Sequence, residues 1–340
     1  MEEEQVNFLP GRAPRRDRDV EPDAGASDRI RPRLRWSVVG VRMLETLRAL
    51  RTSIGARWRF LLLIPVLVAC VVAAVALRAA SVHLPYPVCV MISEYPDRPI
   101  KGVRGAAIAY EWVEWDGSKS VLAVFTRKPG SEVGPVAPLS IGAAHLAYTY
   151  GNVACGMTLP EAEQLIRSYA CPLMRARLES GQYATLDEIA ASFERQRYRL
   201  LPEEGYMMNR GKTRVEGGLA SLVSGVGDDG AEVFRWSWDG RYYRRAIGEE
   251  EVRVSAVVVL YAQGGPNDSG AFPDGVFAGN RGPAVVYAGG RETKAYWTRY
   301  PLPVPITLED EHGTLPLPGG PVWFHIVTSN AGYSVTTGGE

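Results

Sequence analysis

The chain has few of the residues that most often build metal and redox sites. Its 340 residues include four histidines and four cysteines, and no Cys-x-x-Cys pair occurs. None of the histidines has a second ligand at the spacing of a zinc site; they are His83, His145, His312 and His325. We therefore expect neither a metal ion nor a cofactor.

The sequence also lacks the common motifs of nucleophilic catalysis and nucleotide binding. It has no Gly-x-Ser-x-Gly elbow, and no Ser or Cys lies in an activating local sequence. Gly225-Val-Gly227-Asp-Asp-Gly230 formally matches the dinucleotide fingerprint. Its two aspartates would repel phosphate, however, and a strand rather than a helix is expected to follow. The pattern predicts a turn.

Three cysteines lie in the part of the chain after residue 79, and an odd number is no disulfide framework. Free, buried thiols are favoured for Cys89, Cys155 and Cys171. A Cys155–Cys171 bridge remains the alternative if the compartment is oxidising.

What the sequence does contain is one long apolar run. Phe60–Leu77 comprises eighteen residues without a charge, which a helix extends over about 27 Å, close to the thickness of a bilayer core. Arg59 and Arg78 flank the run and can reach the two interfaces. We expect a transmembrane helix over residues 59–78.

The arginines predict the orientation of this helix. Residues 1–59 hold thirteen arginines, no lysine and nine acidic residues, whereas residues 79–340 carry a net charge of −5. The positive-inside rule then places the N-terminus in the cytoplasm and the larger part outside the plasma membrane, as a single-pass protein. Nucleic acid is not expected as a partner of the acidic exported part.

Cys70 offers a second interpretation of the apolar run. Leu67-Val68-Ala69-Cys70 has the form of a bacterial lipobox, after which Cys70 would be lipidated. Against it, the run continues for seven residues beyond Cys70, and the leader would be long. Both interpretations place the remainder of the chain in the same compartment.

The segments before the span differ in composition. Residues 1–35 are rich in Arg, Pro, Asp and Glu, which predicts a disordered cytoplasmic tail. Residues 36–57 carry apolar side chains at spacings of three or four opposite charged ones. This pattern predicts an amphipathic helix on the membrane surface. The membrane, in which the chain is expected to be an integral protein, is its first expected partner.

The exported part reads as an α+β protein with two subdomains. The first, at 85–215, is mixed α/β. Its expected strands are 88–92, 106–110, 121–125 and 152–155, and its expected helices are 141–150, 158–180 and 185–198, the last two beginning with capping boxes at Thr158–Glu161 and Thr185–Glu188.

The second subdomain, at 230–330, is expected to be β-rich. Glycine-rich residues 217–230 are taken as a boundary or long loop, and 264–282 as another loop. The expected strands are 233–238, 253–262, 284–287, 294–299 and 322–327, with a hairpin turn at Asp239-Gly240.

Glu111 is the main candidate for chemistry. In a strand, Glu111 and Glu114 point to opposite faces and cannot act as a pair on one substrate. Glu111 is either a buried, hydrogen-bonded structural carboxylate or a general acid or base. The exported aromatics are either core residues or the lining of a groove. The candidate ligand-binding residues are Glu111, Trp238, Asp239, Arg244, Trp297 and Arg299.

Two blocks of the chain have a distinctive sequence. One is PVCVMISEYPDRPIKGVRGAAIAYEWVEWDGSKSVLAVF with the following GPVAPLS and LAYTY; the other comprises FRWSWDGRYYRR, VSAVVVLYAQ, YWTR and ITLEDEHGTLPLPGGPVWFHIV. In order and spacing these blocks resemble the two domains of the YerB-like family of bacterial envelope proteins. The resemblance implies a membrane-anchored or lipidated envelope protein with a domain of unknown function.

The departures from that family concern its polar residues. The family has Asp-Asn where this chain has Ser93-Glu94, an arginine at Ser120, and an Arg-Ser-x-Arg run at Ala137–Ser140. A Pro-His-Asn motif of the family is missing here, whereas Glu111 is retained. The resemblance implies that the fold is kept and that much of the charge of the family's polar cluster is lost.

We therefore expect a non-catalytic binding or scaffolding module of the cell envelope. Its partner would be a wall component or a membrane protein, as the anchor, the aromatic content and the missing catalytic motifs suggest. The alternative is an envelope hydrolase or transferase that acts on a wall polymer, with Glu111 as general acid or base.

Overall fold

The structure, a computed structural model, describes residues 68–70, 83–114, 116–127, 132–168, 173–195, 211–262, 281–299, 305–328 and 332–338. Within these residues no helix is both long and apolar enough to cross a bilayer. Residues 68–70 are helical, and Cys70 is exposed. The predictions for 1–35 and 36–57, and for all but these three residues of 59–78, lie outside the described part.

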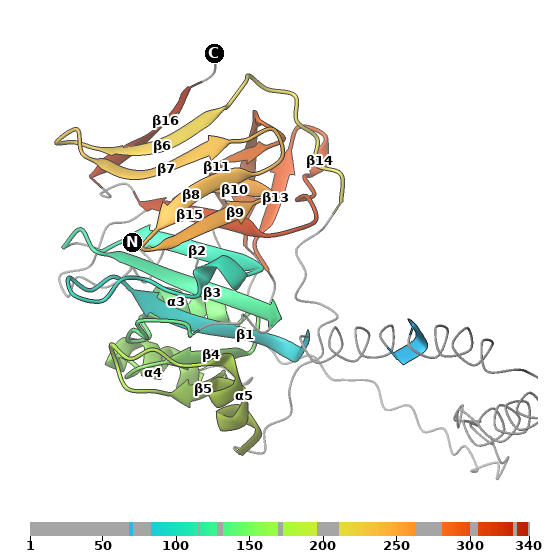
Figure 1. Cartoon of the computed structure of the whole chain (residues 1–340). Coiled ribbons are helices and arrows are strands. Elements are labelled where there is room, and N and C mark those ends of the chain that lie inside the picture. Colours follow the sequence, from blue (N-terminus) through green and yellow to red (C-terminus); the bar gives the residue numbers. More distant parts are fainter. Residues whose placement is uncertain are drawn as a thin grey trace, which may run out of the picture. The chain divides into compact units, whose positions relative to one another are not determined.

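The chain from Ala73 to Glu340 forms one compact unit built around an eleven-stranded sheet (Figure 1). The strand order is β14-β13-β12-β11-β10-β15-β2-β3-β1-β4-β5. The strands are β1 (His83–Ser93), β2 (Ile108–Val113), β3 (Lys119–Arg127), β4 (Asn152–Cys155), β5 (Met174–Arg177), β10 (Ala256–Ala262), β11 (Arg281–Ala288), β12 (Arg291–Thr298), β13 (Thr307–Asp310), β14 (Gly313–Thr314) and β15 (Val322–Thr328).

The two expected subdomains share this sheet. β15 pairs in parallel with β2, with Trp323 opposite Ala109, and also in parallel with β10. Strands from 85–215 and from 230–330 therefore form one continuous layer, which differs from the expected arrangement of two successive subdomains.

A second sheet has five strands in the order β16-β6-β7-β8-β9. Its strands are β6 (Leu222–Gly227), β7 (Glu232–Trp238), β8 (Tyr243–Ile247), β9 (Glu250–Val254) and β16 (Tyr333–Gly338). The expected loop at 217–230 is therefore wrong for 222–227, because β6 is held between β7 and the C-terminal β16. The expected turn is confirmed at Asp228–Gly230. The single strand expected at 253–262 is divided at Ser255 between the two sheets.

The helices are short: α3 (Ile141–Ala147), α4 (Pro160–Ser168), α5 (Leu186–Arg195) and the 3-10 turn η1 (Val103–Gly105). At α5 the capping box is confirmed. The backbone N–H of Thr185 donates to the Glu188 carboxylate (2.8 Å), and that of Glu188 donates to the Thr185 hydroxyl (3.2 Å).

The helix expected over 158–180 is wrong for residues 173–180, which are not helical. α4 begins at Pro160, and the hydroxyl of Thr158 accepts a hydrogen bond from Arg175 (3.3 Å). Residues 174–177 form β5, which pairs in parallel with β4. Met, Arg and Ala are good helix formers, so this pairing overrides the local preference.

The large sheet is buried on both faces along its central strands, β10, β15, β2, β3 and β1. In β1, Val88, Val90 and Ile92 pack in one core with residues of α5 and the five-stranded sheet, while Cys89 and Met91 pack in the other core with α3 and α4. Burial on both sides explains why these strands are continuous apolar runs, whereas β11 and β12 alternate between exposed and buried residues. Figure 1 shows α4 and α5 beside β4 and β5, and the five-stranded sheet beside the half that carries β10 and β15.

Two glycines with positive φ provide a matched test of this packing. Gly102 (φ 80°) and Gly117 (φ 82°) share a left-handed backbone, but a Cβ at Gly102 would lie 2.8 Å from Val133 Cα, whereas Gly117 faces open space. We expect Gly102→Ala to lower the free energy of unfolding by about 1–3 kcal/mol more than Gly117→Ala, because only the former adds a clash to the conformational cost. Urea titration of both variants measures the difference, and equal losses would contradict the packing of this loop.

Candidate functional site

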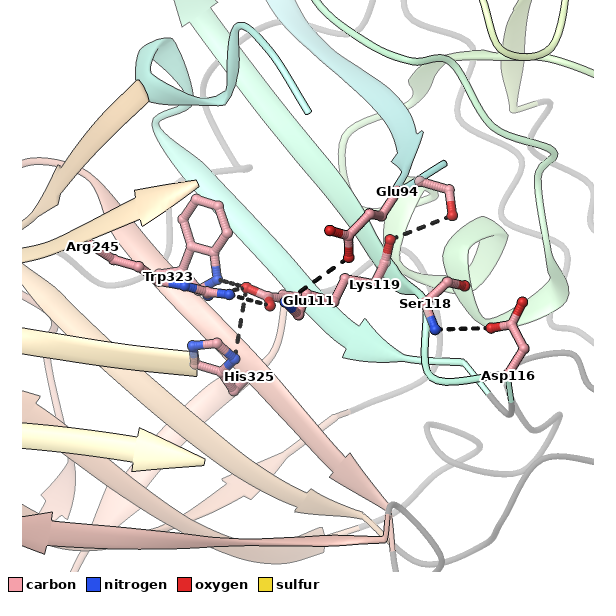
Figure 2. A network of polar contacts seen from close by, with 9 residues as sticks. Glu94, Glu111, Asp116, Ser118, Lys119, Arg245, Trp323 and His325 are labelled. Atoms are coloured by element: carbon pink, nitrogen blue, oxygen red, sulfur yellow. Dashed lines mark hydrogen bonds and ion pairs between the residues drawn. The ribbon is translucent and has the colours of Figure 1, made fainter. Parts of the chain in front are cut away.

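A buried polar cluster joins the two sheets at Glu111. The Glu111 carboxylate is 2% exposed and accepts two hydrogen bonds from Arg245 of β8, at 2.5 Å from Nη1 and 2.9 Å from Nη2. The indole of Trp323 on β15 donates a third, at 2.7 Å. Figure 2 shows these side chains converging on Glu111 from separate strands.

Aromatic rings surround the guanidinium of Arg245. Its carbon Cζ lies 5.6 Å from the ring centroids of both Phe234 and Trp236, and 6.0 Å from that of Trp323. The two indoles are tilted at a centroid distance of 5.5 Å. Cation–π contacts therefore supplement the two-point ion pair, which leaves Arg245 only 8% exposed.

His325 completes the cluster as a neutral imidazole. Its Nε2 accepts a hydrogen bond from the indole of Trp236 (2.8 Å), and Phe234 stacks on its ring at a centroid distance of 3.6 Å. Burial lowers the pKa of His325 to about 3. Because Nε2 is an acceptor, the proton of the neutral ring resides on Nδ1, which lies 3.8 Å from Glu111.

This geometry fits a structural carboxylate at Glu111 and not a general acid or base. Burial raises the pKa of Glu111, but the charge of Arg245 and the hydrogen bonds from Arg245 and Trp323 outweigh it and hold the pKa at about 2. A general acid needs a raised pKa and access to a substrate. The interpretation of Glu111 as a buried, hydrogen-bonded carboxylate is confirmed.

The other predicted ligand-binding residues do not gather around Glu111. Asp239 and Arg244 form an ion pair at the β7–β8 turn, and the half-buried Trp238 packs on Tyr243 at a ring distance of 5.0 Å. The carboxylate of Asp239 also accepts hydrogen bonds from the backbone N–H groups of Arg241 and Tyr242. The expected hairpin is confirmed, and its polar residues stabilise the turn.

Trp297 and Arg299 are buried in the core. Trp297 is 1% exposed, and its indole donates to the carbonyl of Tyr261 (2.8 Å). Arg299 is 3% exposed and donates to the carbonyl of His145. Neither side chain presents the contact surface that the aromatic content suggested.

A cavity of about 690 Å³ lies where β1 and β2 end and β3 begins. It is lined by Met91, Ser93, Glu94, Tyr95, Pro96, Glu114, Asp116, Gly117, Ser118, Ser120, Ala137, Pro138, Ser140 and Leu159. Three carboxylates, four serine hydroxyls and the hydroxyl of Tyr95 therefore line one space, whose volume is typical of small-ligand sites.

Glu114 is a carboxyl of this cavity whose pKa is raised. Burial raises its pKa, and the nearby charge of Asp116 raises it further, against hydrogen bonds from Ser120 and Trp112. The Trp112 indole donates to Glu114 at 2.7 Å. A half-buried carboxyl with a raised pKa at a cavity is the pattern of a functional residue.

The cavity and the Glu111 cluster lie on the same hairpin, as Figure 2 shows. The ammonium of Lys119 on β3 lies 3.9 Å from the Glu94 carboxylate. The hydroxyl oxygens of Ser93 and Ser120 lie 3.2 Å apart. In β2, Glu111 faces Arg245 of the five-stranded sheet, whereas Glu114, just after β2, lines the cavity.

Two buried cysteines and one exposed His/Glu group are further residues with reactive or metal-ligating side chains. Cys89 and Cys155 are free and buried, as expected, and burial raises both thiol pKa values, to about 11 for Cys155. Cys171 lies outside the described part. Glu216, Glu311 and His312 place ligand atoms within 4.8 Å of one another, all exposed, a proximity that the sequence spacing did not reveal.

The fold resembles that of a solved protein structure. The crystal structure of the YerB protein from Bacillus subtilis superposes with a TM-score of 0.62, over 76% of this chain and 95% of that chain, at 18% sequence identity. The sequence matches no protein-family model and no curated protein. At this identity the likeness shows the fold alone.

The residues that depart from the YerB-like pattern fall in the cavity. Ser93-Glu94, Ser120, Ala137 and Ser140 all line it. The polar positions named from the sequence are thus brought together by the fold at one place, while Arg245, Trp323 and His325 were missed. Alternation along β8 carried a signal for Arg245, because it shares a face with the aromatic Tyr243 two residues before it.

Removing one partner of the buried ion pair should be costly. We expect Arg245→Met to lower the free energy of unfolding by about 3–5 kcal/mol, because it leaves the Glu111 charge buried and unpaired. The double variant Glu111→Leu/Arg245→Met should lose less than Arg245→Met alone. Urea titration of the variants tests this, and strict additivity of the two single losses would contradict the coupling.

Acid should destabilise the fold through His325. Because its pKa is lowered in the folded protein, the unfolded chain binds more protons between the ordinary value near 6.5 and about 3. The contribution of His325 to the free energy of unfolding is therefore fully present above pH 6.5. It falls as the pH falls, by up to about 1.4 kcal/mol per pH unit.

His325→Gln keeps an acceptor for Trp236 and removes that titration. Unfolding free energies at pH 6, 5 and 4 should fall less steeply in this variant than in the wild type. His312→Gln, at an exposed histidine, should keep the wild-type slope. An unchanged slope in His325→Gln would show that His325 is already protonated in the folded protein.

Proposed function

We propose that the protein is a membrane-anchored, extracytoplasmic binding module of a bacterial cell envelope, and a divergent member of the YerB-like family. The cavity bounded by Glu94, Glu114 and Ser120 is its ligand site. The observation that carries the proposal is the convergence of carboxylates and hydroxyls on one space of about 690 Å³.

The anchor is supported by the sequence. Phe60–Leu77 is long enough for a bilayer and is preceded by an arginine-rich segment, so the folded unit lies outside the cytoplasm. Lipidation at Cys70 would lead to the same compartment. The family assignment is supported by the likeness of fold and by the order of the matching sequence blocks.

The lining of the cavity suits a polar wall component. Carboxylates accept hydrogen bonds from the hydroxyl, amide and amine groups of glycans and their peptides, and serine hydroxyls both accept and donate them. Tyr95 adds an aromatic side chain to the same space. A membrane-protein partner is the other form of this function, and capture from the intact membrane distinguishes the two.

Glu114 gives the enzymatic alternative its specific support. A hydrolase or transferase of a wall polymer needs a carboxyl with a raised pKa within reach of its substrate, and Glu114 meets both conditions where Glu111 does not. In that case Glu94 and Asp116 are the further carboxylates in the same cavity.

Capture by the full-length protein in its own membrane provides the first test. The protein carries a photo-crosslinking residue in place of Ser118 at the cavity, and in place of Gln164, an exposed position on α4, as control. Glycan-linked adducts specific to position 118 support the wall-ligand form, and a single membrane protein supports the scaffold form. The same adducts at both positions contradict the cavity as the site.

Charge removal in the cavity should weaken binding without unfolding the protein. We expect Glu114→Gln and Glu94→Gln each to weaken binding of soluble muropeptides by roughly tenfold, the usual effect of losing a charge-assisted hydrogen bond. Glu161→Gln, on the exposed face of α4 outside the cavity, is the matched control.

Calorimetric titration measures the binding, and release of soluble wall fragments measures catalysis. Binding without release fits the module. Release that Glu114→Gln abolishes establishes the enzyme instead. Equal affinities in all three variants would rule out this cavity as the muropeptide site.

A further inference from the structure

A second cavity, of about 490 Å³, lies at the opposite end of the same strands. β2 and β15 begin there, β3 ends there, and His83 at the start of β1 pairs with Arg127. Its lining consists of Pro87, Arg104, Gly105, Ala106, Ala107, Ile108, Val124, Thr126, Arg127, Tyr150, Gly319, Gly320 and Pro321.

The lining combines apolar walls with two cations. Ala107 and Pro321, both half-buried, supply apolar surface above the buried Ile108 and Val124, and the lining includes no carboxylate. Arg104 and Arg127 are exposed residues of the same lining. A ligand that satisfies both features has an aliphatic part for the walls and an anionic group for the guanidiniums.

The backbone that carries Arg104 is fixed by the second sheet. The carboxylate of Glu250, at the start of β9, accepts hydrogen bonds from the backbone N–H groups of Gly102 (3.0 Å) and Arg104 (3.3 Å). On the other side, Arg127 ends β3 in register with β1. Both cations therefore project from anchored backbone.

The position in the chain brings this cavity near a bilayer if the protein is anchored as proposed. His83 follows Arg78, the end of the expected span, by five residues, which reach at most about 18 Å when fully extended. The first cavity lies beyond, at the far ends of β1 and β2.

We propose that this second cavity binds an anionic phospholipid of the anchoring membrane. An acyl chain occupies the apolar space, and the phosphate lies between the guanidiniums of Arg104 and Arg127. The folded unit is thereby held against the bilayer at a fixed end, independently of what the first cavity binds. The inference uses the proposed anchor and not the proposed wall ligand.

The test uses the full-length protein in nanodiscs that contain phosphatidylglycerol or phosphatidylcholine with a photoactivatable group in the acyl chain. We expect phosphatidylglycerol to label peptides that contain residues 104–108, 124–127 or 319–321. The double variant Arg104→Gln/Arg127→Gln should lower this labelling about 30-fold, as expected for the loss of two cations at a membrane surface. Labelling of residues 36–78 in the same molecules is the internal reference.

Two further variants distinguish binding in this cavity from attraction of the lipid to positive surface charge in general. Arg241→Gln removes an exposed arginine at the β7–β8 turn and should leave the labelling unchanged. Ala107→Phe fills the cavity while keeping both arginines, and should abolish the labelling; its urea titration confirms that the variant folds.

Three outcomes overturn the proposal. These are equal labelling by the zwitterionic lipid, labelling that persists in the double variant, and labelling confined to residues 36–78. Absence of labelling at residues 36–78 as well would contradict the anchor itself, and so separates failure of the proposed anchoring from failure of this inference.

Discussion

The ion pair between Glu111 and Arg245 is the contact on which the arrangement of the two sheets depends. Each charge loses its hydration on burial, at a cost of several kcal/mol per ion, and the opposite charge is the main compensation for that loss. Glu111 belongs to β2 of the large sheet and Arg245 to β8 of the small one. A packing that slides β8 past β2 would leave both charges buried and alone, so the register between the sheets is specified chemically as well as by shape.

The strands could be predicted where the pattern is local. The apolar runs of β1, β3 and β15 are unbroken because both faces are buried, and the sequence shows this directly. β6 was missed because its glycines resemble a loop, and its pairing with the C-terminal β16 has no local signal. Residues 174–177 were predicted as helix because their pairing with β4 has no local signal either. That pairing, and not the helix preference of the residues, decides that they form β5.

The candidate site could be predicted only in part. Glu111 stood out because a glutamate inside an apolar strand demands a partner, yet its Trp323 partner is 212 residues away in sequence. Strand alternation decides which arginine of β8 reaches Glu111. It turns Arg245 toward the core and Arg244 toward Asp239 at the β7–β8 turn. The altered positions at Ser93, Ser120 and Ala137 gained meaning only when the fold placed them on one cavity.

The two cavities lie at opposite ends of β1, β2 and β3, and they differ in chemistry. The end nearest the expected span in sequence is apolar and basic, and the far end is acidic and rich in hydroxyls. An anionic bilayer surface attracts the first set of residues and repels the second. In the anchored protein that we propose, this polarity would turn the carboxylate-lined cavity away from the membrane, so the proposed anchor and the proposed ligand chemistry of the distal cavity are consistent with each other.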